Sequence, residues 1–298
     1  MKKNLLTIRE LDKGDIMALI DKGLKLKARG RKTERSLTGY ILGLMFDKAS
    51  TRTRVSFEAA MFRLGGQTLF LSRADTQMSR DETIADTARV LSRYIDILAI
   101  RTYSQEMVEE MASWSDIPVI NALTDLYHPC QVLSDLMTVK EKKGQLENLK
   151  VAWIGDGNNV AHSWINAAHI IGFELLLSCP SGYHPLSEVL DGVGKNIHMV
   201  DDPREAAENA DVINTDVWAS MGQEDQRGKR ISDFSGFQVD KALVSLGKPD
   251  VLVMHCLPAH REEEITSEVL DGPNSIVFDQ AENKLYLHQA LLEGMLVD

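Results

Sequence analysis

The sequence contains few cysteines and has less positive than negative charge. Among its 298 residues are three cysteines, and no two of them are separated by two residues. Neither a disulfide framework nor a Cys-X-X-Cys zinc site is therefore predicted. The 33 lysines and arginines are outnumbered by 44 aspartates and glutamates, which gives a formal net charge of −11. This balance argues against nucleic acid or an anionic membrane surface as the partner, because both require a broad basic face.

Long apolar segments are also missing. No run approaches the roughly 18 apolar residues of a transmembrane helix. Residues 1–7 lead into charged sequence without the apolar core of a signal peptide. We therefore expect a cytoplasmic protein with no membrane partner. The length favours about two domains, and 44% hydrophobic residues are ordinary for a globular protein.

A turn rich in hydroxyl groups and arginine follows an apolar segment near residue 50. Residues 40–46 predict a buried strand, and residues 55–64 have apolar side chains at helical spacing. Between them stand Ser50, Thr51, Arg52, Thr53 and Arg54. A helix cap alone would explain one hydroxyl residue, but not three hydroxyls together with two arginines. Since a helix N-terminus also offers backbone N–H groups and partial positive charge, we expect a site for a phosphate-sized anion. Any such site in this acidic protein must be a local pocket.

Strand and helix signals alternate through the rest of the chain. Further strands are expected at residues 67–72, 95–100, 118–121, 151–154, 174–178, 211–216, 250–254 and 275–278. This alternation predicts an α/β fold with two doubly wound parallel-sheet domains joined by interdomain helices. We place the domains at residues 1–144 and 145–298, and we expect a C-terminal helix from about 281 to 298 to pack back on the first domain.

Polar side chains follow several of the predicted strands. Arg101 comes after the strand at 95–100, and His128 and Gln131 share one face of the first turn of a later helix. A strand-end arginine or a helix-start histidine is often only a solvated or capping residue. Because ligands of parallel sheets bind beyond the carboxyl ends of the strands, we expect Arg101 to lie near the Ser50–Arg54 turn.

The polar segment at 72–83 has two interpretations that the sequence does not separate. It is either a mobile surface loop or a lid that reaches a neighbouring site.

The second half carries a different polar set. Gly155 and Gly157 open like a dinucleotide-binding fingerprint, but Val160 stands where the third glycine belongs, and no acid ends the strand at 174–178. A carboxylate, amides, a hydroxyl and a thiol follow the strands here, with Asp216 as the carboxylate. This set suits a molecule with an amino group, and with the anion site of the first half it predicts group transfer in an interdomain cleft.

These residues resemble a known family, the aspartate/ornithine carbamoyltransferases. The carbamoyl-phosphate half of that family is similar to the Ser50–Arg54 turn, Arg101 and His128-Pro129-Cys130-Gln131. Its ornithine branch is similar to Asp216-Val217-Trp218-Ala219-Ser220-Met221-Gly222 and His255-Cys256-Leu257-Pro258. Gln77 stands in the polar loop, where the aspartate branch has lysine. The resemblance covers the chain from about residue 5 to the C-terminal helix.

The resemblance implies a role for each of these residues. It assigns catalysis to Arg101, His128, Gln131 and Cys256. It assigns carbamoyl phosphate to Ser50, Thr51, Arg52, Thr53, Gln77, Arg101, His128, Gln131, Cys256, Leu257 and Lys284. It assigns ornithine to Asn159, Asp216, Ser220, Met221 and Cys256. Lys284 is a departure, because the family usually has arginine there, and lysine keeps the charge without the bidentate fork.

The implied activity is transfer of the carbamoyl group of carbamoyl phosphate to the δ-amine of L-ornithine, giving L-citrulline and phosphate in arginine metabolism. The resemblance implies no metal and no organic cofactor, and a homo-oligomer that is a trimer or a multiple of trimers. In that trimer Gln77 would reach the phosphate of the adjacent subunit. The alternatives are transfer to another amine such as putrescine, a nicotinamide-dependent dehydrogenase, and a phosphate-sensing protein without catalysis.

Overall fold

The computed structural model describes residues 3–30, 34–72, 82–219 and 224–297. The chain divides into two compact units, residues 1–137 with 282–298, and residues 138–281. The boundary predicted after residue 144 stays a prediction. Among the described helices, none combines the length and the apolar character that a membrane crossing demands.

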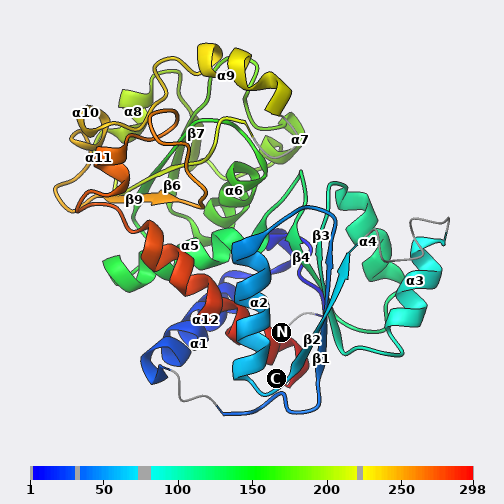
Figure 1. Cartoon of the computed structure of the whole chain (residues 1–298). Helices are drawn as coiled ribbons and strands as arrows, with labels where there is room; N and C mark the ends of the chain where they lie inside the picture. The colour runs from blue at the N-terminus through cyan, green and yellow to red at the C-terminus, as the bar shows by residue number, and fades with distance from the viewer. Residues whose placement is uncertain (1–2, 31–33, 73–81, 220–223, 298) are drawn as a thin grey trace. The chain divides into compact units, whose positions relative to one another are not determined.

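The first unit is built on a four-stranded parallel sheet with strand order β2-β1-β3-β4. Its strands are β1 (Ile41–Phe46), β2 (Gln67–Ser72), β3 (Ile97–Arg101) and β4 (Val119–Leu123). The predicted strands of this half are therefore confirmed. Apolar side chains of β1 and β3, including Met45, Leu98 and Ile100, form a buried core with helices α3 (Ile84–Leu91) and α4 (Gln105–Trp114). Figure 1 shows α3 and α4 together on one side of this sheet.

Capping residues determine where α1 and the helix after β1 begin. Asp12 is extended and caps α1 (Lys13–Arg29), and a short 3-10 turn, Ile8–Glu10, precedes it. Helix α2 spans Thr51–Arg63 and so includes the residues at helical spacing from 55 onward. The Ser50 hydroxyl accepts the Thr53 N–H at 3.2 Å, and this cap starts the helix at Thr51. The hydroxyl and arginine residues therefore lie in its first turn.

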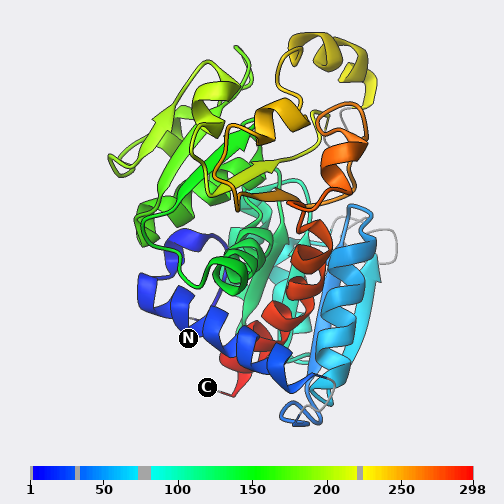
Figure 2. The same cartoon turned by 90° about the vertical axis from the view of Figure 1, so that its left-hand side faces the viewer.

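The C-terminal helix α12 (Val277–Leu296) belongs to the first unit from Glu282 onward. Lys27 of α1 donates to Asn283 at 2.7 Å, and Lys284 donates to the Thr53 hydroxyl of α2 at 3.2 Å. Figures 1 and 2 both show α12 beside α1 and α2. The predicted return of the last helix to the first domain is confirmed.

The second unit is built on a five-stranded parallel sheet with strand order β7-β6-β5-β8-β9. Its strands are β5 (Lys150–Ile154), β6 (Glu174–Ser178), β7 (Ile197–Met199), β8 (Val212–Thr215) and β9 (Leu252–His255). One strand of this sheet was missed, and one predicted strand is wrong. The edge strand β7 was not predicted, because three residues are too few to show a pattern. The strand expected at 275–278 is a single bridge from Ser275 to Val253, and Val277 already begins α12.

Short helices cover the second sheet. Helix α6 (Asn159–Ile171) follows β5, and on the sheet's other face the core includes apolar residues of α8 (Pro203–Ala207), α10 (Lys241–Val244) and α11 (Ser267–Leu270). The remaining helices are α5 (Pro129–Lys143), which passes from the first unit into the second, α7 (Ser187–Leu190), the 3-10 turn Glu224–Gln226 and α9 (Arg227–Asp233).

Both sheets reverse their strand order in the same way. In the first sheet the chain winds outward in opposite directions from the adjacent strands β1 and β3, and in the second from β5 and β8. Ligands of open parallel sheets bind beyond the carboxyl ends of such strand pairs. The residues that follow β1, β3, β5 and β8 are therefore the first candidates for a site.

Candidate active site

The first cluster begins where β1 and β3 end. Arg101 is the last residue of β3 and is only 5% exposed. Its carbonyl oxygen accepts the Asp47 N–H at 2.8 Å, and the Thr102 hydroxyl donates to the Asp47 carboxylate at 2.6 Å. These bonds tie the two strand ends together. The first turn of α2 follows directly, with Thr51 exposed, Arg52 half-buried and Thr53 buried.

Lys284 lies at the centre of this cluster. Its ammonium donates to the Thr53 hydroxyl at 3.2 Å and to the Gln131 side-chain oxygen at 2.9 Å. The Gln131 amide nitrogen in turn donates to Asp135 at 2.8 Å. Lys284 is only 5% exposed, so a positive charge sits inside the unit between α2 and α5. The side chain that departs from the family pattern is thus in contact with two predicted site residues.

Two histidines beside Lys284 are held neutral. Burial lowers the pKa of His128 well below its usual value, and the positive charges of Lys284 and Arg101 lower it further. Burial and the charge of Lys284 do the same to the pKa of His288. A neutral imidazole can donate one N–H without carrying charge, so His128 can serve as a hydrogen-bond donor at neutral pH.

His288 and Ser56 were not found from the sequence. Nδ1 of His288 lies 3.0 Å from the Ser56 hydroxyl, and its ring stacks on Phe57 with centroids 3.6 Å apart. One signal was available, because His288 comes four residues after Lys284 and so shares its helix face. Cys130 also lies here, and burial raises the pKa of its thiol to about 12. It therefore behaves as an inert core side chain rather than a nucleophile.

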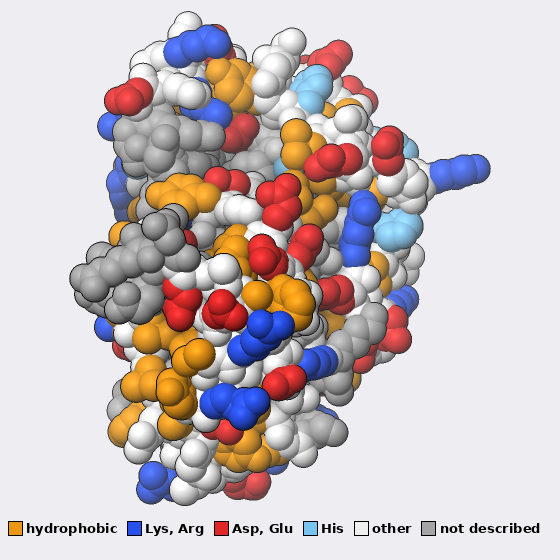
Figure 3. Space-filling view, turned by 90° about the vertical axis from the view of Figure 1, so that its right-hand side faces the viewer, with side chains coloured by type: hydrophobic (Ala, Val, Ile, Leu, Met, Phe, Trp, Pro, Cys, Tyr) orange, Lys and Arg blue, Asp and Glu red, His pale blue; other side chains and the backbone are white. Residues whose placement is uncertain are grey.

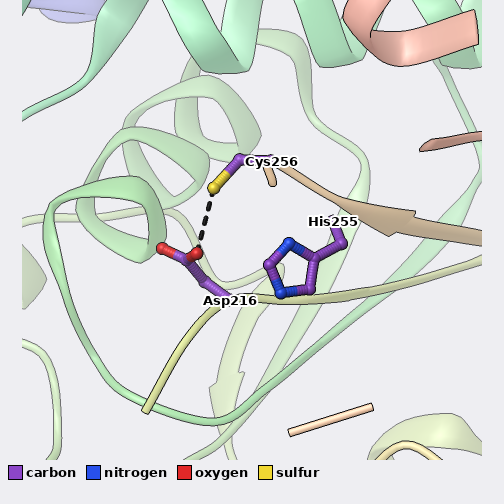
Figure 4. A group of neighbouring side chains, drawn as sticks. All are labelled: Asp216, His255 and Cys256. Carbon is purple, nitrogen blue, oxygen red and sulfur yellow. Dashed lines mark hydrogen bonds between the residues drawn. The ribbon is translucent and has the colours of Figure 1, made fainter. Parts of the chain in front are cut away.

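The second cluster is centred on Asp216, which follows β8. One oxygen of its carboxylate accepts from the Cys256 thiol at 2.9 Å and from the Val217 N–H at 2.8 Å. The other oxygen accepts from the Asn158 amide at 2.9 Å. Figure 4 shows the thiol directed at the carboxylate, with the His255 ring beside both. Asp216 and Cys256, which the resemblance assigns to the same substrate, are therefore in direct contact.

Asn158 is one of the amide residues after β5, where the sequence indicated hydrogen bonding but assigned no substrate to this residue. Its side-chain oxygen accepts the Val160 N–H at 2.9 Å, which caps α6, while its amide nitrogen reaches Asp216. The predicted residue Asn159 is the first residue of α6 and is half-buried. The helix-cap signal at Asn158 was visible in the sequence, but its second bond to Asp216 depends on the tertiary fold.

A buried arginine ties the segment after Asp216 to the end of β5. Arg230 of α9 donates to the Asp156 carboxylate at 2.9 Å and to the Trp218 carbonyl at 2.5 Å. Burial raises the pKa of Asp156 to about 6, Arg230 opposes this rise, and the negative charge of Asp216 adds to it. Asp156 is consequently ionised at neutral pH, and its charge is matched by Arg230.

Two groups in this unit have the residue types of metal ligands. Asp216, His255 and Cys256 each place a ligand atom within 4.8 Å of the others, and so do His260, Glu263 and Glu264. In the first group the atoms already bond to each other or to neighbours, since Nδ1 of His255 accepts the Leu257 N–H and Nε2 donates to Glu264, both at 2.9 Å. These bonds would have to break before a metal could bind there.

The structure thus gathers part of the predicted site. In the first unit Thr53, Gln131 and Lys284 are joined by hydrogen bonds, and Arg101 and His128 interact electrostatically. In the second unit Asp216 and Cys256 are joined. Three predicted residues lie outside the described part of the chain, namely Gln77, Ser220 and Met221. The ligand assigned to each residue stays a prediction.

Family models match both halves of the chain. Residues 3–141 match the carbamoyl-P binding domain of aspartate/ornithine carbamoyltransferase, and residues 147–295 match its Asp/Orn binding domain.

Whole-chain relatives agree with these matches. The chain is 54% identical to the ornithine carbamoyltransferase of Syntrophus aciditrophicus, over 99% of this chain and 100% of that protein. It is 50% identical to the ornithine carbamoyltransferase of Desulfotalea psychrophila, with the same coverage. Among solved structures, the ornithine carbamoyltransferase from Pyrococcus furiosus superposes with a TM-score of 0.95 at 46% identity, covering 99% of this chain and 97% of that one.

Proposed function

Because the chain belongs to the aspartate/ornithine carbamoyltransferase family, we propose that it transfers the carbamoyl group of carbamoyl phosphate to the δ-amine of L-ornithine, giving L-citrulline and phosphate. The observation that carries this proposal is the match to two whole-chain relatives, 54% and 50% identical to this chain, that are both named ornithine carbamoyltransferase. A carbamoyl-P binding domain and an Asp/Orn binding domain follow one another in the chain, which supports both substrates.

The first unit supplies the groups for carbamoyl phosphate. We assign the phosphate to the first turn of α2, through Ser50, Thr51, Arg52 and Thr53, and to Lys284. The helix N-terminus adds backbone N–H groups and partial positive charge to these side chains. The buried ammonium of Lys284, already within 3.2 Å of the Thr53 hydroxyl, supports a role for lysine where the family usually has arginine.

Arg101, His128 and Gln131 are assigned to the carbamoyl group. Arg101 and Thr53, with the neutral His128, would donate to the carbonyl oxygen, where negative charge grows as the carbon becomes tetrahedral. Donors placed for that oxygen stabilise the transition state more than the substrate. The Gln131 side-chain oxygen accepts one bond from Lys284. Its second lone pair can accept from the carbamoyl NH₂, together with the carbonyl groups of Cys256 and Leu257.

Ornithine is assigned to the second unit. Asp216 would bind the α-ammonium group, with Asn159, Ser220, Met221 and Cys256 as further ligands. The described bonds to Asp216 come from a thiol, an amide and a backbone N–H, all of which are neutral. Its negative charge is therefore opposed by no cation among these three donors, which suits an ammonium ligand.

The reaction needs no group beyond the two substrates and these donors. The neutral δ-amine attacks the carbonyl carbon and forms a C–N bond. The tetrahedral intermediate then collapses with cleavage of the bond from this carbon to the phosphate oxygen. Phosphate leaves and takes up the proton of the amine. Holding the reactants in the attacking geometry lowers the entropic part of the barrier.

We further propose a role in arginine biosynthesis, a cytoplasmic location and a homotrimer in which Gln77 contacts the phosphate site of the adjacent subunit. Exposed apolar residues of α2 and of the edge strand β2, Val55, Phe62, Leu69 and Phe70, support association with another copy of the chain. On the face drawn in Figure 3, acidic and basic side chains are interspersed among the described residues, which fits small-molecule substrates better than nucleic acid.

An assay of the purified protein tests the proposal. Carbamoyl phosphate is supplied with L-ornithine, putrescine or L-aspartate, and the carbamoylated product is identified in each case. Citrulline should form with ornithine, and the rate at limiting ornithine should rise from pH 7 toward pH 9 because the attacking amine must be neutral. Turnover of putrescine or aspartate in place of ornithine, or none at all, would refute the assignment. A size measurement in solution tests the trimer separately.

A further inference from the structure

We infer that the buried His255–Glu264 pair positions the Cys256–Leu257 turn of the site, with Glu264 acting through His255. The inference rests on the proposed function, since it concerns the same site. Both side chains are 0% exposed. His255 is the last residue of β9, and the turn follows directly.

The hydrogen bonds determine the protonation of His255. The Leu257 backbone N–H donates to Nδ1 at 2.9 Å, so this nitrogen must carry a lone pair rather than a proton. The imidazole is therefore neutral and has its proton on Nε2. That Nε2–H lies 2.9 Å from an oxygen of Glu264, which accepts it. The carboxylate thus selects the one tautomer that can accept from Leu257.

Glu264 is itself held in place. The same oxygen accepts the His260 N–H at 2.6 Å, and the Glu264 carbonyl accepts the Val239 N–H at 2.8 Å. Two backbone N–H groups therefore hold Glu264 in place, one at its carboxylate and one at its main-chain carbonyl. The carboxylate in turn holds the imidazole of His255.

The turn requires such support. Leu257 has a φ of 57°, in the left-handed region that is unfavourable for a leucine. The bond from its N–H to His255 favours this conformation over the alternatives. The same turn carries the Cys256 thiol, which lies 2.9 Å from Asp216, and the two carbonyl groups proposed to accept from the carbamoyl NH₂. By holding this turn in one conformation, the His255–Glu264 pair therefore aligns groups that are proposed to contact both substrates.

Two substitutions of His255 separate its two bonds. In His255→Asn the side-chain oxygen can take the place of Nδ1, so the acceptor for Leu257 is kept and the contact with Glu264 is lost. In His255→Gln the longer side chain reaches the position of Nε2, so the contact with Glu264 is kept and the acceptor is lost. We expect kcat/KM for both substrates to fall at least about tenfold in His255→Gln and by less than about threefold in His255→Asn, the size of one lost hydrogen bond to a buried group.

Reactivity of the Cys256 thiol gives a readout that does not depend on turnover. Cys130 and Cys179 are buried, whereas Cys256 is partly exposed, so alkylation by iodoacetamide of the folded protein reports on Cys256. We expect faster alkylation in His255→Gln than in the unchanged protein, and an unchanged rate in His255→Asn.

Substitutions of Glu264 test whether this carboxylate acts through His255. Glu264→Leu removes the acceptor and should behave as His255→Gln does, while Glu264→Gln keeps an oxygen acceptor and should restore most of the activity. Glu263→Leu is the matched control, because Glu263 is the adjacent residue and pairs with Arg227 at the surface. It should stay within about twofold of the unchanged protein.

Equal behaviour of His255→Asn and His255→Gln, in rate and in alkylation, would overturn the inference, and so would a larger loss in the asparagine variant. A Glu264→Leu variant that fails to fold leaves the His255 pair and the Glu264→Gln variant to decide. If the unchanged protein makes no citrulline, the proposed function fails, and the alkylation rates still test this inference.

Discussion

The two sheets place their clusters at equivalent points, but the buried charges of the two clusters have opposite signs. Beyond β1 and β3, the described bonds of the Lys284 ammonium go to a hydroxyl and an amide oxygen. Beyond β5 and β8, the described bonds of the Asp216 carboxylate come from a thiol, an amide and a backbone N–H. The first cluster thus contains a buried cation, which suits an anionic ligand, and the second contains a buried carboxylate, which suits a cationic ligand.

The second carboxylate of the second unit makes the contrast sharper. Asp156 is matched by the buried Arg230, whereas Asp216 has neutral donors. These two carboxylates follow neighbouring strands but have different roles. Asp156 anchors α9, whereas Asp216 is proposed to bind ornithine. The comparison shows that the strand order determines where a site lies. The buried charges at that place, together with their partners, determine which ligand the site binds.

The largest expected effect comes from removing charge from the first cluster. Arg101→Ala or Arg52→Ala should lose charge-assisted bonds worth roughly 2–3 kcal/mol, and so lower kcat/KM for carbamoyl phosphate on the order of a hundredfold. Steady-state kinetics of citrulline formation measure this. Arg89→Ala is the control, because Arg89 pairs with Asp86 at the surface of α3. Near-normal kcat/KM in either variant would remove that arginine from the site.

A smaller loss is expected from Lys284. Lys284→Met keeps the apolar stem but removes the donor to Thr53 and Gln131, which should raise the KM for carbamoyl phosphate about tenfold and leave the KM for ornithine nearly unchanged. Lys284→Arg restores a cation and should recover most of the affinity. An equal rise of both KM values would mean that the substitution disturbs folding rather than the anion site.

The next effect tests the second cluster. Cys256→Ser replaces the thiol that donates to Asp216, and we expect the KM for ornithine to rise about fivefold, corresponding to about 1 kcal/mol, with a smaller change for carbamoyl phosphate. The comparison of the two KM values is the measurement. Unchanged KM and kcat would make Cys256 a strand-end thiol without a role in binding.

The smallest effect concerns stability rather than rate. Burial raises the pKa of Asp156 from 3.8 to about 6. At pH values between these two, the folded state therefore holds a proton on Asp156 that the unfolded state has released. This contribution to stability is present below the lower pKa and is lost as pH rises through about 6. It should amount to about 1 kcal/mol between pH 5 and pH 7.

Asp156→Asn isolates this term, because the amide does not titrate. Chemical denaturation at both pH values should show the variant gaining stability relative to the unchanged protein by that amount as pH rises. A constant difference between the two proteins would contradict the raised pKa. Asp201→Asn, at an exposed aspartate of the same unit, is the control.

Much of the fold could be predicted because its signals are local. Strands β2 and β6 have the predicted bounds, since each is a short apolar run between breaks. The exact starts of α1 and α2 depend on side-chain caps at Asp12 and Ser50, and the apolar pattern alone does not show where these helices begin. The bridge at Ser275 could not be told from a strand by composition.

The candidate site was predictable as residue types at strand ends, but not as contacts. Arg101 and Asp216 were found because they follow strands of a parallel sheet. The bond from Asn158 to Asp216 and the stack of His288 on Phe57 join residues far apart in the chain, and no local pattern encodes them. The Lys284 ammonium lies between side chains of α2 and α5, and that position also depends on tertiary packing.

Helix α12 has a consequence for how the chain is made. The first unit takes in residues 282–298, and Lys284 and His288 lie in that last segment. During synthesis the N-terminal sheet emerges first, but its buried cation arrives only after nearly the whole chain has been translated. A fragment ending at residue 137 would lack the helix that packs beside α1 and α2. The assembly of the first unit therefore depends on a segment that follows the whole second unit in the sequence.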